Sequence, residues 1–172
     1  MVSHPAWSAD GMWVAFLRSP TSPSGTGFPD SAALWVARFN GSDAHQVSSV
    51  GHQVEEFAWA ALSDTLGFSD TSDPANGHWQ LLTATPQSSP RTLLNEMYPF
   101  DLAWSPTGDS LAVTAISGAI GPSGQWNGML QVLPAHGGSA HTVYTSPDNA
   151  IDLAGWSPNG KYLAFWIDPQ SS

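Results

Sequence analysis

Four stretches of the chain have the same pattern of residue types, and in each of them large and small apolar residues alternate. Each stretch carries a tryptophan at its second position, passes through a short polar turn and ends in an apolar run; the four are residues 6–17, 58–69, 103–114 and 155–166. Alternation with a period of two is typical of β-strands, because successive side chains point to opposite faces of a sheet. Each stretch therefore predicts a β-hairpin, and its second strand, apolar on both faces, should be covered on both sides.

Three of the four predicted turns have the composition of tight β-turns. Their sequences are Ser-Ala-Asp-Gly, Ser-Pro-Thr-Gly and Ser-Pro-Asn-Gly, which end at Gly11, Gly108 and Gly160. Proline presets φ at the second position of such a turn, and glycine accepts the left-handed conformation that closes it. The remaining turn, after Ala60, lacks the glycine and is the weakest of the four.

The four stretches are copies of one repeat. Their leading tryptophans, spaced 45–52 residues apart, are Trp7, Trp59, Trp104 and Trp156. A second motif of two further strands lies between consecutive copies, at residues 34–47, 79–93 and 130–143. Four-stranded units at this period, without helical periodicity, predict an all-β fold built of β-propeller blades. Each second strand also carries one small residue, where a neighbouring sheet could approach closely: Ala15, Gly67, Ala112 and Ala164.

The strand count predicts about three and a half blades in a single domain. We place this domain at residues 1–172, its blades at about 4–50, 51–95 and 96–146, and the half blade at 147–168. An incomplete ring leaves a blade face and several strand edges open, and open edges invite pairing with another chain. Either the chain is a piece of a larger propeller, or copies associate as a homo-oligomer to cover the open faces.

The sequence motifs of the repeats resemble those of a known family. The motif W-S-P-x-G at 104–108 and 156–160, followed in the last copy by Leu163-Ala164-Phe165, is similar to the TolB-type, WD40-like propeller repeats of bacterial proteins. The resemblance covers essentially the whole chain and implies a β-propeller. Such repeats occur in periplasmic scaffold proteins and in accessory domains of peptidases, so the resemblance also implies a periplasmic or extracellular location.

Charge narrows the classes of partner. The chain has 14 acidic and 4 basic side chains, and its formal net charge is −10. Nucleic acids and anionic membrane surfaces must be met by Lys and Arg, so neither is an expected partner, and no stretch is apolar enough for membrane insertion. Plain solubility is the alternative explanation of the acidity. The chain has no cysteine, which excludes disulfides and thiolate metal sites.

Polar residues stand just before the leading tryptophans. In propellers that share the resemblance, this position lies at one mouth of the central channel. We therefore expect a ring of mainly negative potential there, able to attract a cation, an amine or a basic peptide. The alternative is that these side chains accept backbone N–H groups where the strands begin. The residues are His4, Glu55, Glu56, Asp101 and Asp152.

Two long loops rich in glycine and proline are the other candidates for binding. Each carries an aromatic residue, Phe28 in the first unit and Trp126 in the third. Exposed aromatic residues on loops often contact a protein or a sugar. The alternative is that each ring folds back as a lid over its own blade.

Motifs for catalysis and cofactor binding are missing. The six histidines show no metal-ligand spacing, and the turn-like segment 70–77 lacks the calcium-loop pattern, so we expect no metal and no cofactor. His45 and His141 share one place in their units with Arg91, which fits a polar outer strand. Neither a G-x-S-x-G elbow nor a phosphate loop is present.

The leading hypothesis is a non-catalytic binding module for a protein or peptide. The alternative is the accessory propeller of a prolyl-oligopeptidase-type serine peptidase, in which the carboxylates would hold the amino terminus of a peptide.

Overall fold

The fold is described from a computed structural model, which describes residues 1–19, 32–73, 78–95, 98–118, 126–147 and 149–168. These ranges contain fourteen β-strands and no helix. No helix in the described part of the chain is therefore available to cross a membrane.

The strands form four antiparallel sheets, in each of which the strands follow one another in chain order. The first sheet contains β1 (Val2–Trp7), β2 (Trp13–Arg18), β3 (Ala33–Arg38) and β4 (His45–Gln46). The second contains β5 (Phe57–Trp59), β6 (Leu66–Asp73), β7 (His78–Ala84) and β8 (Arg91–Asn95). The third contains β9 (Tyr98–Trp104), β10 (Ser110–Gly118), β11 (Trp126–Pro134) and β12 (His141–Pro147). The last contains only β13 (Ala150–Trp156) and β14 (Leu163–Asp168). The predicted all-β class and the count of about three and a half blades are confirmed.

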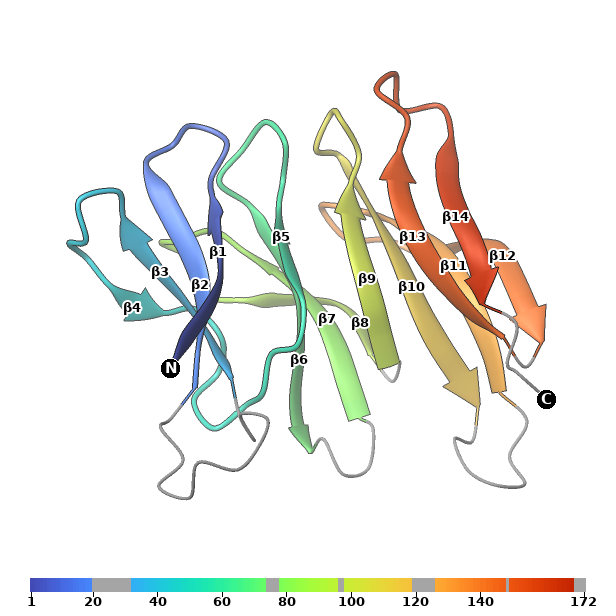
Figure 1. Cartoon of the computed structure of the whole chain (residues 1–172), viewed down its shortest axis with the longest axis horizontal. Coiled ribbons are helices and arrows are strands. Elements are labelled where there is room, and N and C mark those ends of the chain that lie inside the picture. The colour runs from blue at the N-terminus through green and yellow to red at the C-terminus, as the bar shows by residue number, and fades with distance from the viewer. Residues whose placement is uncertain (20–31, 74–77, 96–97, 119–125, 148, 169–172) are drawn as a thin grey trace.

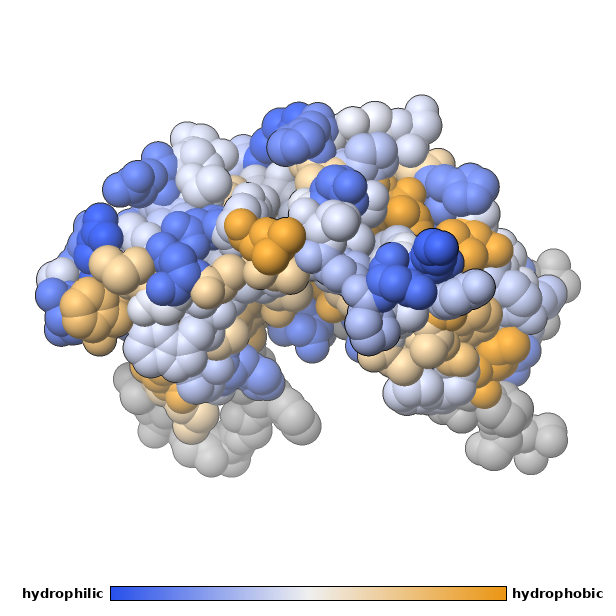
Figure 2. Space-filling model, turned by 90° about the horizontal axis from the view of Figure 1, so that it is seen from above, coloured by the Kyte–Doolittle hydropathy of each residue, from blue (hydrophilic) through white to orange (hydrophobic). Residues whose placement is uncertain are grey.

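The four sheets stand in a row in chain order (Figure 1). Neighbouring sheets contact each other through their first strands, β1 with β5, β5 with β9 and β9 with β13. Seen from above, the molecule is an arch with a hollow on one side (Figure 2). We call the end with the β1–β2, β5–β6, β9–β10 and β13–β14 turns the turn end (Figure 1).

A serine organises three of the four turns. The Oγ atoms of Ser8, Ser105 and Ser157 accept the backbone N–H at the start of the returning segment, at 2.9–3.2 Å. The glycines that close these turns have φ of 68–73°, as the turn sequences predicted. The serine of the repeat therefore satisfies a donor that the turn would otherwise leave unpaired.

The leading tryptophans join one sheet to the next. The indole N–H of Trp59 donates to the carbonyl oxygen of Ala6, Trp104 to Ala58, and Trp156 to Ala103, each at 3.0 Å. Each acceptor is the residue just before the tryptophan of the preceding sheet. The repeat thus encodes an inter-sheet hydrogen bond as well as an apolar contact.

Beside each indole, a large residue of one second strand packs on the small residue of the previous one. Ala15 belongs to one cluster with Trp59 and Leu66, and Ala112 to another with Trp156 and Leu163. At Gly67, a Cβ atom would lie only 2.9 Å from Leu111 Cδ2. The close approach expected at the small residues is therefore present at Gly67, and Ala15 and Ala112 share clusters with residues of the following sheet.

Candidate binding site

The predicted polar residues lie within or just before the first strands of their sheets, which are irregular. Strand pairing shifts between Ser3 and Ala6, and again between Val113 and Ala115 on the partner of β9. His4 lies in the first irregularity with φ of 51°, which is rare for a residue with a side chain. Such bulges re-aim side chains at the end of a strand.

Two buried hydroxyl groups hold the acidic residues in place. Ser69 Oγ accepts the backbone N–H of Glu56 at 3.0 Å and that of Glu55 at 3.3 Å. Thr114 occupies the same position in the next sheet, where its Oγ1 accepts the N–H of Asp101 at 3.1 Å. Both hydroxyl residues are fully buried. They were not predicted, although a polar residue at an apolar strand position in two copies was a usable indication.

Glu55 connects the second sheet to the third. Its Oε1 accepts a hydrogen bond from Tyr98 Oη at 3.2 Å. The Tyr98 ring meets the ring of buried Trp79 edge-on, with centroids 5.3 Å apart. Partial burial raises the pKa of Glu55, while the Tyr98 hydrogen bond acts in the opposite direction.

Asp101 connects the third sheet to the last. Its Oδ2 accepts the backbone N–H of Leu153 at 2.9 Å and the hydroxyl of Thr114 at 3.3 Å. The carboxylate thus satisfies a backbone donor, as the alternative for these residues expected, but the donor lies at an irregularity inside β13 rather than where the strand begins. Asp101 therefore has a structural role in addition to its charge.

The pKa of Glu56 depends on the charges of other predicted residues. Partial burial raises its pKa, and the negative charges of Asp101 and Glu55 raise it further. The N–H of Phe57 and a protonated His4 act in the opposite direction. Four predicted residues that precede three tryptophans therefore share one electrostatic site, which we call the acidic cluster: His4, Glu55, Glu56 and Asp101.

The other predicted residues are placed less completely. Asp152 is half-buried in β13, next to Leu153, whose backbone N–H donates to Asp101. Trp126 is the first residue of β11 and pairs with Gly118 of β10, but the structure does not describe its side chain. Phe28 lies outside the described residues.

A second titratable pair lies near the acidic cluster in sequence. His52 Nδ1 is 3.1 Å from Oδ1 of Asp70, whose side chain is 1% exposed. Burial raises the pKa of Asp70, and the nearby imidazole opposes this shift.

Asp70 lies inside β6, which continues to Asp73, so the predicted turn at 70–77 cannot begin before that residue. The capping residues of this segment predicted a turn from Asp70 onward, but the chain continues in β6, whose pairing with β7 is irregular after Asp70.

Among the described residues, no three His, Asp or Glu side chains come together as a metal ion would require.

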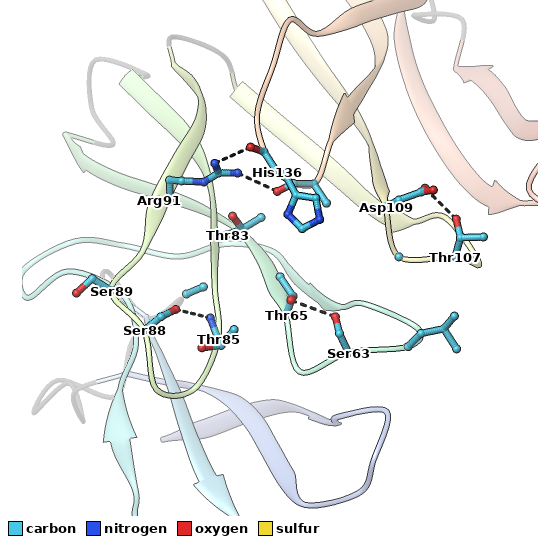
Figure 3. Close-up of a pocket in the computed structure, with 14 residues that line it drawn as sticks. Ser63, Thr65, Thr83, Thr85, Ser88, Ser89, Arg91, Thr107, Asp109 and His136 are labelled. Carbon is cyan, nitrogen blue, oxygen red and sulfur yellow. Dashed lines mark hydrogen bonds between the residues drawn. The ribbon is translucent and has the colours of Figure 1, made fainter.

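A cavity of about 590 Å³ lies between the second and third sheets (Figure 3). Two of its hydroxyl groups donate within the lining: Ser63 to the hydroxyl of Thr65, and Thr107 to the carboxylate of Asp109. Arg91 spans the gap, donating to the carbonyl oxygens of His136 at 2.7 Å and Ala135 at 2.9 Å (Figure 3). Arg91 therefore ties the second sheet to the third across this cavity.

The same kind of contact occurs one sheet earlier. His45, at the position equivalent to Arg91, has its Nε2 atom 2.7 Å from the carbonyl oxygen of Pro86 in the second sheet. The polar residues expected on the outer strands thus tie two of the three fourth strands, β4 and β8, to the following sheet.

Comparison with known proteins identifies the architecture. No protein-family model and no curated protein matches the sequence. A solved structure assigned to TolB from Agrobacterium tumefaciens matches 98% of this chain with a TM-score of 0.67 at 12% identity. TolB from Acinetobacter baumannii matches 100% of the chain with a TM-score of 0.63 at 16% identity. The chain has a TolB-type β-propeller fold.

The TolB-type fold is shared by larger molecules. The chain spans 59% of the length of the first TolB structure and 39% of the second. An acylaminoacyl peptidase from Pyrococcus horikoshii also matches, over 88% of this chain and 26% of that one, with a TM-score of 0.64 at 8% identity. Identities this low establish the fold alone, so function has to be argued from the site.

Proposed function

We propose that this chain is a non-catalytic binding module whose acidic cluster receives a positively charged segment of a peptide or protein. The observation that carries the proposal is the placement of acidic residues from neighbouring sheets by equivalent hydroxyl groups, Glu55 and Glu56 by Ser69 and Asp101 by Thr114. The negative charges of Asp101 and Glu55 act in the same direction as burial, which raises the pKa of Glu56. Carboxylates held together in this way repel one another, and a cationic ligand relieves that repulsion. Perturbed acids at one end of a repeat fold are typical of binding sites.

The construction of the site supports the proposal. Glu55 and Glu56 are fixed through their backbone N–H groups by Ser69, which leaves both side chains partly exposed. The carboxylate of Glu55 is also held by Tyr98 Oη, and a group that is positioned before the ligand arrives loses less conformational entropy on binding. The net charge of −10 adds a long-range attraction for cations.

The partner is a cationic peptide or protein segment rather than a nucleic acid. Only four Lys and Arg residues are available in the chain. Arg91 is engaged with backbone carbonyls, and Arg18 and Arg38 stack on tryptophan rings at 4.6 and 4.5 Å. Few cations therefore remain for phosphate groups.

The experiment is a titration of the chain with a fluorescent Lys/Arg-rich peptide, followed by anisotropy at low and high salt. Glu56→Gln should weaken binding by up to about fivefold, as expected for one partly exposed ion pair. Added salt should weaken the wild-type complex and reduce the difference between the proteins. Asp109→Asn removes a carboxylate at the turn end and serves as the matched control. Equal affinities for Glu56→Gln and the wild type would contradict the proposal.

A second candidate is the propeller part of a peptidase, favoured by the match to the acylaminoacyl peptidase. In that case the acidic cluster would hold the amino terminus of a peptide substrate. A parent gene that continues into a domain with a G-x-S-x-G motif would support this candidate, and one that continues into further blades would support the first. The periplasmic or extracellular location implied by the resemblance is part of the proposal in both cases.

A further inference from the structure

The chain repeats one sheet-to-sheet interface three times. On one side, a leading tryptophan and the first apolar residue of the following strand project toward the previous sheet; we call this pair the knob. On the other side, a small residue of the second strand and the carbonyl before the tryptophan receive them; we call this pair the socket. The occupied sockets contain Ala15 and Ala112, both 0% exposed, and Gly67, which is also buried.

One knob has no socket within the described part of the chain. It consists of Trp7, which is 59% exposed, and Val14, which is half-buried. Trp104, at the same position in the third sheet, is 8% exposed. The other three leading indoles each donate to a carbonyl at 3.0 Å, whereas no described residue accepts from the indole of Trp7.

One socket has no knob within the described part of the chain. It consists of Ala164 in β14, which is exposed, and the carbonyl of Gly155, which precedes Trp156. Two residues after the small residue, the last sheet has Trp166 at 56% exposure. The equivalent positions of the three complete sheets are at most 4% exposed: Leu17, Ser69 and Thr114. The last sheet thus presents to solvent a face that the other sheets bury.

The free knob and the free socket lie on the sheets at the two ends of the row (Figure 1). They are two halves of an interface that this chain already makes internally, so each is complementary to the other in shape and in hydrogen bonding. The match uses sheet faces and does not require pairing at the free edge of β14.

We propose that two copies of this chain associate head to tail, with Trp7 and Val14 of one copy packed on Ala164 of the next. In this contact, the indole N–H of Trp7 donates to the carbonyl oxygen of Gly155. A second copy is the occupant because it presents the small residue and the strand carbonyl that the tryptophan requires. The contact is heterologous, so further copies add in the same sense unless the rotation closes a ring.

The test is the mass of the chain of residues 1–172 in solution, measured by sedimentation equilibrium across a wide concentration range. The wild type should associate as its concentration rises. Trp7→Ala removes the knob and Ala164→Arg blocks the socket, and each should weaken association by about tenfold or more, as expected for a central interface residue. Both side chains are exposed, so both variants should keep the wild-type circular dichroism spectrum. Val50→Ser, at a site 90% exposed and outside both surfaces, is the matched control.

Mixing the two variants separates this contact from any other. Trp7→Ala keeps an intact socket and Ala164→Arg keeps an intact knob, so together they should form a one-to-one dimer that grows no further. Three outcomes would overturn the proposal. The first is a wild-type chain that stays monomeric, as expected if other blades or a different protein cover these faces. The second is association that neither variant weakens, and the third is a mixture that does not pair.

Discussion

At the scale of single residues, small polar groups decide how this all-β chain arranges its charges. Ser69 is the clearest example, because its hydroxyl accepts the N–H groups of Glu55 and Glu56 at the start of a strand. A buried backbone donor without a partner destabilises a fold by roughly 1–3 kcal/mol, so one oxygen atom has a measurable effect here. The same hydroxyl also sets the positions of two side chains of the acidic cluster.

Replacing Ser69 with alanine should therefore lower the free energy of unfolding by about 1–3 kcal/mol, because two N–H groups lose their acceptor. Urea denaturation monitored by tryptophan fluorescence measures the change. Ser72→Ala lies on the same strand but at an exposed position, and should change stability by less than about 0.5 kcal/mol. A loss of similar size in both variants would contradict this role for Ser69.

Glu56 should make stability depend on pH in a definite direction. Its pKa in the folded chain is raised above the ordinary value of 4.5, so the folded state binds a proton more readily than the unfolded state. Stability therefore falls as pH rises through the raised pKa, and the penalty is fully present at neutral pH.

Glu56→Gln should accordingly be more stable than the wild type at pH 7, and the difference should vanish below about pH 4.5. Denaturation midpoints measured at several pH values give the comparison. An advantage of the variant that is constant across this range would show that the charge of Glu56 is not its cause.

At the scale of elements, the sheets are joined by a repeated contact rather than by connecting loops. Each internal interface combines an indole–carbonyl hydrogen bond with a large residue packed against a small one. On the outer side, Arg91 and His45 each reach a carbonyl of the following sheet. The first three sheets are thus joined near their first strands and again near their fourth.

Trp104→Phe keeps an aromatic ring but removes the indole N–H, and should lower the free energy of unfolding by about 1 kcal/mol or more. Trp7→Phe should have almost no effect in the dilute chain, since no described residue accepts from that indole. Chemical denaturation of both variants at low concentration makes the comparison. Equal losses would contradict the hydrogen-bonded link.

At the scale of the whole molecule, the repeat made the architecture predictable. Tryptophan spacing, turn glycines and alternating apolar residues are local patterns, and they were enough to predict the sheets and their number. Even the close approach at Gly67 followed from residue size. The acceptors of the indoles could not be predicted in the same way, because each lies in the preceding copy and is a backbone atom.

The candidate site was predicted only in part for a related reason. Position before the tryptophan singled out His4, Glu55, Glu56 and Asp101, but the sequence cannot tell a carboxylate that binds a partner from one that caps a strand. Asp101 does accept a backbone N–H group, that of Leu153, although at an irregularity inside β13 rather than at its start. Tyr98 and Thr114 were missed because a lone hydroxyl in a strand has no motif of its own.

The indole–carbonyl hydrogen bonds between sheets affect how cooperatively the chain unfolds. Each of them joins a sheet only to its immediate neighbour, at sequence separations of 46 and 53 residues. In such a linear array, stability is the sum of each unit and its nearest-neighbour couplings. The inner units are coupled on two sides and the terminal ones on a single side, so fraying and amide hydrogen exchange begin at the first and last sheets.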